Sequence, residues 1–197
     1  MIRFNNDYNR GAMPEVMQAL NNLQSESFAG YGDDSQCDKA AAIIRRLTGC
    51  ESADVRFFPG ATQANFIVIA AALSRVQSVI SADTGHINCH EAASIENTGH
   101  KVLALPNSDG KLTAARVAEC AEEYRSSGGA EYLTEPKLVY ISFPTEQGTL
   151  YSLSELEAIS AVCKEYGMYL FVDGARMSYG LASEVNDVTL PDLARLA

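Results

Sequence analysis

Short apolar runs alternate with stretches of helical length from Val55 to Asp173, and this alternation limits the possible folds more than any other feature of the chain. The pattern predicts strands at residues 55–58, 78–81, 101–105, 138–143 and 168–173, with helices at 62–75, 88–97, 113–125 and 152–166. Strands separated by helices of this length form βαβ units, in which neighbouring strands run parallel. The sequence therefore predicts an α/β fold with a mostly parallel sheet.

The two ends of the chain differ from this pattern. Residues 1–35 contain an arm, a helix at Pro14–Leu23 that starts with proline, and a polar loop. The α/β domain is predicted over residues 36–197, and its first helix covers Cys37–Thr48. A last helix at 190–197 stops in mid-turn without a glycine, asparagine or basic residue to cap it, so we expect the natural domain to continue further.

Charge and cysteine content argue against several classes of protein. The 197 residues carry a formal net charge of −10 and an isoelectric point of about 4.7, which disfavours binding to nucleic acid or to an anionic membrane surface. The five cysteines form no Cys-x-x-Cys pair, so we expect reduced thiols in a cytoplasmic protein. No apolar run approaches the ~20 residues of a membrane-spanning helix, and no signal-peptide core is visible.

The strand predicted at 168–173 ends in Asp173, and Arg176 follows on the turn that leaves it. Open α/β sheets bind ligands at the carboxyl ends of their strands. A carboxylate there can hold a protonated ring nitrogen, and a nearby guanidinium can hold a carboxylate or phenolate. The alternative is structural, with Asp173 capping the next helix and Arg176 paired with it.

A second candidate site lies where the strand at 55–58 gives way to the next helix. Gly60, Ala61 and Thr62 form a small-residue turn that opens the helix, and free backbone N–H groups at such a position favour a phosphate. The turn matches neither the Walker A loop nor the dinucleotide glycine pattern. The alternative is an ordinary threonine cap at the start of a helix.

A pair of histidines follows the next strand, in the stretch DTGHINCHE. His86 comes after a glycine at the strand end, and His90 stands four residues later with Glu91 beside it. This spacing allows two histidines to share a metal, although no third ligand stands in a recognised spacing. His86 could equally lie flat against an aromatic ligand, or both histidines could be ordinary polar residues at a helix start.

Three strand ends therefore offer a phosphate cradle, a flat ring and a carboxylate. Pyridoxal 5′-phosphate (PLP) needs this set, because an aspartate that keeps its ring nitrogen protonated makes it an electron sink. The chain also resembles the threonine aldolase and aromatic amino acid beta-eliminating lyase family of fold-type I PLP enzymes. The matching stretches, in the family's order, are Asn6–Met13, Tyr31–Asp34, Thr62–Asn65, His86–Glu91, Gly110–Thr113, Gly148–Leu156 and Val172–Arg176.

The resemblance implies a three-layer α/β/α large domain and a role for each matching residue. It implies that Gly60, Ala61 and Thr62 cradle the phosphate, that His86 stacks on the pyridine ring and that Asp173 pairs with the ring nitrogen. By the same resemblance, Arg176 holds the substrate carboxylate or the phenolic oxygen of the cofactor, while Asn6 and Tyr31 contact substrate. No metal is implied.

Some stretches depart from the family pattern. Ala61 replaces the usual glycine of the phosphate turn. Residues 126–136 lack the histidine that many threonine aldolases carry there, and Pro144–Gln147 replaces a stretch that usually contains Asn-Thr-His. These departures weaken the assignment to threonine more than the assignment to a PLP lyase.

The resemblance implies a PLP-dependent lyase that cleaves the Cα–Cβ bond of a β-hydroxy amino acid to glycine and an aldehyde, and that forms a homodimer or homotetramer. In the family, the lysine that binds PLP lies about thirty residues beyond the aspartate, which would be just past residue 197. We therefore expect a large-domain fragment, truncated before the C-terminal small domain and inactive alone. The alternatives are a β-eliminating lyase, another fold-type I PLP enzyme, or a non-catalytic α/β domain that binds an anion.

Overall fold

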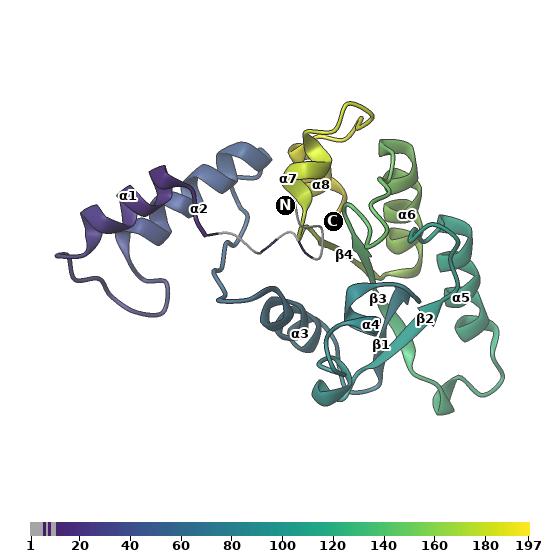
Figure 1. Ribbon diagram of the computed structural model, residues 1–197. Coiled ribbons are helices and arrows are strands. Elements are labelled where there is room, and N and C mark those ends of the chain that lie inside the picture. Colours follow the sequence, from purple (N-terminus) through teal and green to yellow (C-terminus); the bar gives the residue numbers. More distant parts are fainter. Residues whose placement is uncertain (1–5, 7, 9–10) are drawn as a thin grey trace. The chain divides into compact units, whose positions relative to one another are not determined.

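The computed structural model describes residues 6, 8 and 11–197, and these residues fall into two compact units, Met1–Ala40 and Ala41–Ala197 (Figure 1). The first unit contains helix α1 (Pro14–Leu23), as predicted, and the start of helix α2 (Ser35–Thr48). Asp34 caps α2, because its Oδ1 accepts hydrogen bonds from the backbone N–H groups of Gln36 and Cys37 at 2.8 and 3.0 Å. No residue of α1 is buried.

The second unit is built on one parallel sheet. Its strands are β1 (Gln77–Ala82), β2 (Lys101–Leu105), β3 (Glu135–Ser142) and β4 (Tyr169–Asp173), and they lie in the order β2-β1-β3-β4. Every neighbouring pair runs parallel. The carboxyl ends of all four strands therefore meet at one edge of the sheet, as the alternation of strands and helices predicted.

Helices cover both faces of the sheet, which makes the unit three layers thick. On one face, α3 (Ala61–Ala72) and α4 (His86–Cys89) contribute side chains to a buried cluster with alternate residues of β1 and β3, Val79, Leu138 and Tyr140 among them. On the other face, α5 (Ala114–Ser126) and α6 (Leu153–Tyr166) pack on the residues between these, including Ile80, Val139 and Ile141. Alternation with period two is what a strand buried on both faces requires.

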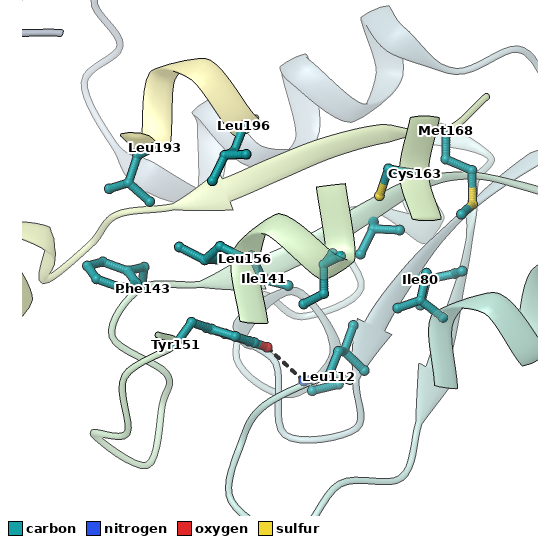
Figure 2. Close-up of a cluster of buried hydrophobic side chains, with 14 of the residues drawn as sticks. Ile80, Leu112, Ile141, Phe143, Tyr151, Leu156, Cys163, Met168, Leu193 and Leu196 are labelled. Carbon is teal, nitrogen blue, oxygen red and sulfur yellow. Dashed lines mark hydrogen bonds between the residues drawn. The ribbon is translucent and has the colours of Figure 1, made fainter. Parts of the chain in front are cut away.

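The larger cluster also holds the C-terminal helices in place. Leu193 and Leu196 of α8 (Leu190–Leu196) are almost fully buried in it, beside Leu156 of α6 (Figure 2). The phenol of Tyr151 is buried in the same cluster, where its oxygen accepts a hydrogen bond of 2.7 Å from the backbone N–H of Leu112. Helix α7 (Met177–Leu181), which the sequence patterns did not predict, follows β4.

The predicted strand at 55–58 is wrong. These residues form no regular structure, and the side chains of Phe57 and Phe58 remain 48% and 39% exposed. Apolar residues alone do not make a strand, because the backbone groups of a strand need a hydrogen-bonded neighbour.

The predicted helix at 88–97 is also wrong for most of its length. The structure has the short helix α4 and then a 3-10 helix, η1 (Glu96–Thr98), with an irregular turn between them. Ala92 and Ala93 lie in the left-handed region, with φ of 49° and 61°, and no right-handed helix can pass through such residues.

Among residues 6, 8 and 11–197, no helix is both long enough and apolar enough to cross a membrane. All five cysteines are free thiols, and Cys163 is buried.

Candidate functional site

Asp173 is the last residue of β4 and is buried at the carboxyl edge of the sheet. Its Oδ2 accepts hydrogen bonds from the hydroxyl of Tyr140 at 2.5 Å and from Nδ2 of Asn65 at 3.2 Å. Its Oδ1 accepts one bond of 3.0 Å from the backbone N–H of Ala175. Since an ionised carboxylate offers about four acceptor sites, these three bonds orient the group and leave acceptor capacity on Oδ1.

Tyr140 comes from the middle of β3, one strand away, and is 1% exposed. Burial and the neighbouring Asp173 carboxylate both raise the pKa of the Tyr140 phenol far above its ordinary value. The hydroxyl therefore keeps its proton at any physiological pH and acts as a permanent hydrogen-bond donor to Asp173.

The amide of Asn65 joins Asp173 to a second buried carboxylate. The same Nδ2 donates to Oε1 of Glu91 at 2.7 Å, and that oxygen also lies 2.8 Å from Nδ1 of His86. The other oxygen of Glu91 accepts a bond of 2.8 Å from the hydroxyl of Ser94. His86 and Asp173, which the sequence placed at separate strand ends, are thus linked through the side chains of Asn65 and Glu91.

Local sequence explains where His86 lies. It begins helix α4, directly after the turn that ends β1. Gly85 suits the tight space in this turn, because a Cβ there would lie 2.2 Å from Oγ of Ser81 and 3.0 Å from the carbonyl oxygen of Ala82. The side chain of His86 is 34% exposed, so one part of the ring faces the buried Glu91 while another remains accessible.

The turn that was predicted to hold a phosphate, Gly60–Thr62, lies at the start of α3. Gly60 is the N-cap in an extended conformation, Ala61 is the first helical residue, and no side chain caps this end of the helix. Thr62 is therefore inside the helix rather than its cap, which corrects the capping interpretation. Thr62 and Asn65 are three residues apart and so lie on the same face of α3, the face that Asn65 directs toward Asp173.

Arg176 precedes helix α7 and lies beside a pocket of about 520 Å³. Its Nη1 is 3.9 Å from Oε2 of Glu146, whose other oxygen accepts a bond of 2.7 Å from the hydroxyl of Ser142. The pocket is lined by residues of the 144–150 loop and of α7, and neither Asp173 nor His86 is among them. The pocket therefore lies next to the Asp173 network and does not coincide with it. This network consists of the hydrogen-bonded side chains of Asp173, Tyr140, Asn65, Glu91, His86 and Ser94.

The remaining predicted residues stand apart from this network or outside the second unit. Asn6 and Tyr31 belong to the first unit, where both are exposed and Tyr31 has a left-handed φ of 65°. His90 is exposed, and its ring centroid is 5.6 Å from that of His86. Within the described part of the chain, no group of three or more His, Cys, Asp or Glu side chains is placed to hold a metal.

Four members of the network were not among the predicted site residues, namely Asn65, Glu91, Ser94 and Tyr140. Two of them could have been found, since Asn65 ends the stretch TQAN and Glu91 ends HINCHE, both already singled out. Tyr140 carries only a weak signal, a single hydroxyl within a buried apolar strand. Such a group needs a hydrogen-bond partner, but the sequence does not say which.

Comparison with known proteins agrees with the resemblance noted in the sequence. The chain is 34% identical over 184 residues to a low specificity L-threonine aldolase of Pseudomonas aeruginosa, covering 91% of this chain and 51% of the relative. The solved structure of the Leishmania major threonine aldolase superposes with a TM-score of 0.93 at 48% identity, covering 98% of this chain and 55% of that one. The chain thus spans about half the length of the relatives that it matches.

More distant structures share only the fold. A PLP-bound C–S lyase of Staphylococcus hominis superposes with a TM-score of 0.59 at 13% identity, covering 83% of this chain and 41% of that one. The model of the family described as beta-eliminating lyase matches residues 6–188. Since this match covers nearly the whole sequence, the chain belongs to the beta-eliminating lyase family.

Proposed function

We propose that this chain is the cofactor-binding part of a PLP-dependent lyase of threonine aldolase type. The complete protein would cleave the Cα–Cβ bond of a β-hydroxy amino acid to glycine and an aldehyde. The observation that carries the proposal is the buried carboxylate of Asp173, oriented by Tyr140, Asn65 and the backbone at the carboxyl edge of the sheet. The threonine aldolases at 34% and 48% identity support the reaction type.

The residues present fit the cofactor. Asp173 has acceptor capacity left on Oδ1 for a protonated ring nitrogen, and His86 presents a partly exposed ring from the neighbouring strand end. The N-terminus of α3 offers unsatisfied backbone N–H groups at Gly60–Thr62, which suit a phosphate. When bound, PLP supplies an electron sink for the bonds at Cα. The chain's own residues hold the ring nitrogen proton, orient the ring and donate backbone hydrogen bonds to the phosphate.

The substrate carboxylate is assigned to Arg176, which lies at the edge of the 520 Å³ pocket. A guanidinium binds a carboxylate through two parallel hydrogen bonds. Glu146, at 3.9 Å, is close enough to orient the guanidinium without forming a tight ion pair. We assign Asn6 and Tyr31 to the substrate site on the family resemblance alone.

None of the lysines in the second unit has a free ammonium beside Asp173. Lys101 and Lys137 lie near the amino ends of β2 and β3, at the opposite edge of the parallel sheet. The ammonium of Lys111 is 2.7 Å from Glu155, and Lys164 is in the last turn of α6. We therefore propose that the lysine that binds PLP is not one of these four, in keeping with a chain that spans about half the length of its relatives.

We also propose residues 1–35 as an arm and 36–197 as the cofactor-binding domain of a cytoplasmic homodimer or homotetramer. The free state of all five cysteines supports a reducing location. Exposed apolar side chains on the first two helices, including Val16, Met17 and Leu20 of α1, support burial against another chain.

PLP titration of the 197-residue chain tests the proposal, with absorbance and induced circular dichroism as readouts. We expect weak, reversible binding that Asp173→Asn weakens about tenfold or more, because a hydrogen bond to a charged group is worth about 1.5–3 kcal/mol. Asp54→Asn is the matched control, since Asp54 forms only an exposed ion pair with Arg56. Equal affinity in all three proteins would refute the assignment of Asp173.

Borohydride reduction tests whether the 197-residue chain contains the lysine that binds PLP. After reduction with PLP present, peptide mapping should find no single lysine modified to one equivalent. A clean adduct at one of the five lysines, together with lyase activity, would mean that the chain is an enzyme by itself. Absence of any PLP binding would favour the non-catalytic α/β domain.

A further inference from the structure

Glu91 is the most deeply buried charged side chain of the network. Its side chain is 0% exposed, and its two oxygens accept three hydrogen bonds, from His86, Asn65 and Ser94. Burying a carboxylate is costly unless it is well hydrogen-bonded. Here the ring of His86 and the amide of Asn65 both donate to Oε1 of Glu91, which stabilises the buried carboxylate.

The backbone is also strained where it brings Glu91 into this position. Ala92 and Ala93 are consecutive alanines in the left-handed region, each of which costs roughly 1–2 kcal/mol. This turn ends the helical structure directly after His90 and brings Ser94 close to Glu91. The backbone N–H of Ser94 donates to the carbonyl of Glu91 at 2.9 Å, and the hydroxyl of Ser94 donates to the Glu91 carboxylate at 2.8 Å. Strain of this kind persists where the surrounding structure determines the position of a functional group.

We propose that Glu91 is the positioning residue of His86. An ionised carboxylate can only accept, so the hydrogen bond of 2.8 Å requires the proton to be on Nδ1 of the imidazole. In the neutral ring, Nε2 is then left without a proton. The amide of Asn65 donates to both Glu91 and Asp173, and so connects the His86–Glu91 pair to the aspartate.

The inference rests on the proposed function only in the statement that His86 faces the cofactor. The hydrogen bonds that carry it belong to the chain itself. If Glu91 served only to satisfy Asn65 and Ser94, removing its carboxylate would leave the tautomer of His86 unchanged. The position of the imidazole proton therefore distinguishes positioning from mere packing.

The test is the tautomer of His86, read from ¹⁵N–¹H long-range correlation spectra of the histidine-labelled 197-residue chain above neutral pH. We expect Nδ1–H in the wild type and in Ser94→Ala, which removes a donor from the other oxygen of Glu91. We expect Glu91→Met, which lacks an acceptor, to change His86 to the Nε2–H form, and Glu91→Gln, which keeps one, to restore Nδ1–H. His100, whose Nδ1 lies 3.1 Å from the carbonyl of Gln77, is the internal standard and should stay unchanged.

Either an Nε2–H tautomer in the wild type or an unchanged tautomer in a folded Glu91→Met variant would overturn the proposal. If Glu91→Met fails to fold, the wild-type tautomer still decides it. In a second arm, bound PLP should show a shifted absorption maximum in Glu91→Met and a normal one in Glu91→Gln and Ser94→Ala. Failure of the wild type to bind PLP would refute the proposed function, and the NMR spectra would still test the role of Glu91. Normal PLP binding together with an unchanged tautomer in Glu91→Met would refute the role of Glu91 alone.

Discussion

The phenol of Tyr140 donates a hydrogen bond of 2.5 Å to Oδ2 of Asp173, from a position 33 residues earlier in the chain. Strands β3 and β4 are neighbours, and their register pairs Tyr140 with Phe171 and Ser142 with Asp173. The phenol therefore reaches along the strand direction to the end of β4. Because its pKa is raised by burial and by the carboxylate, it remains a donor throughout the physiological pH range.

Tyr140→Phe should therefore lower the free energy of unfolding by about 1.5–3 kcal/mol, the usual value of a hydrogen bond to a charged group. Urea unfolding of the 197-residue chain measures this. Tyr132→Phe is the matched control, because Tyr132 is 87% exposed and its loss should change stability by less than about 0.5 kcal/mol. Equal effects of the two substitutions would mean that the Tyr140 bond contributes nothing.

Ala92→Gly should raise the free energy of unfolding by about 0.5–1 kcal/mol, since glycine adopts a left-handed φ without steric cost. The same substitution at Ala118, inside helix α5, should lower it by about 1 kcal/mol. Thermal or urea unfolding of both variants gives the comparison. A loss of stability at Ala92 would contradict the left-handed turn.

Gly110→Ala should destabilise the chain by at least about 1–2 kcal/mol. Gly110 has a φ of +85°, and an added Cβ would lie 2.7 Å from Oγ1 of the buried Thr145. Gly128 serves as the control, because its surroundings are open and its φ is not left-handed, so Gly128→Ala should be nearly neutral. Unfolding midpoints in urea would show the difference.

Stability should fall at alkaline pH because of a buried thiol. Burial raises the pKa of Cys163 to about 12 from an ordinary 9.0. The unfolded thiol loses its proton first, so the stability that Cys163 contributes is complete below about pH 9 and is lost as pH rises toward 12. The slope is at most about 1.4 kcal/mol per pH unit.

Urea unfolding between pH 8 and 10 measures this slope. Cys163→Ala should flatten it, whereas Cys89→Ala, at an exposed position, should leave it unchanged. Cys120, whose pKa is also raised by burial, adds a share in the same direction. The buried phenols of Tyr140 and Tyr151, whose pKa values are raised too, add theirs toward pH 10. A slope that survives in Cys163→Ala would assign the alkaline loss to other groups.

The start of helix α6 depends on a reciprocal cap. Oγ of Ser152 accepts from the backbone N–H of Glu155 at 3.2 Å, and the Glu155 carboxylate accepts from the backbone N–H of Ser152 at 2.8 Å. Ser152→Ala should cost about 0.5–2 kcal/mol of unfolding free energy, while Ser152→Asp, which keeps an acceptor, should cost much less. If the two variants unfold at the same urea concentration, the cap does not stabilise the helix.

The sequence by itself determined the α/β class, most of the elements and two of the three candidate strand ends, those before His86 and at Asp173. The helix at Pro14–Leu23 and the strand at Lys101–Leu105 were predicted at their observed bounds, because proline placement and apolar runs between turns are local signals. The motifs around His86 and Asp173 could be recognised for the same reason, as each lies within a few residues of a strand end.

Only the tertiary structure decided how these motifs are joined. Asn65 bonds to Asp173, 108 residues away, and Tyr140 reaches the same carboxylate from another strand. Such contacts depend on sheet order and register, which no local pattern encodes. The failures have the same origin: Val55–Phe58 looks like a strand but forms no strand pairing, and Ala92–Ala93 look helical but turn left-handed where Glu91 is buried. Local propensity gives way wherever long-range hydrogen bonds and burial stabilise another backbone conformation.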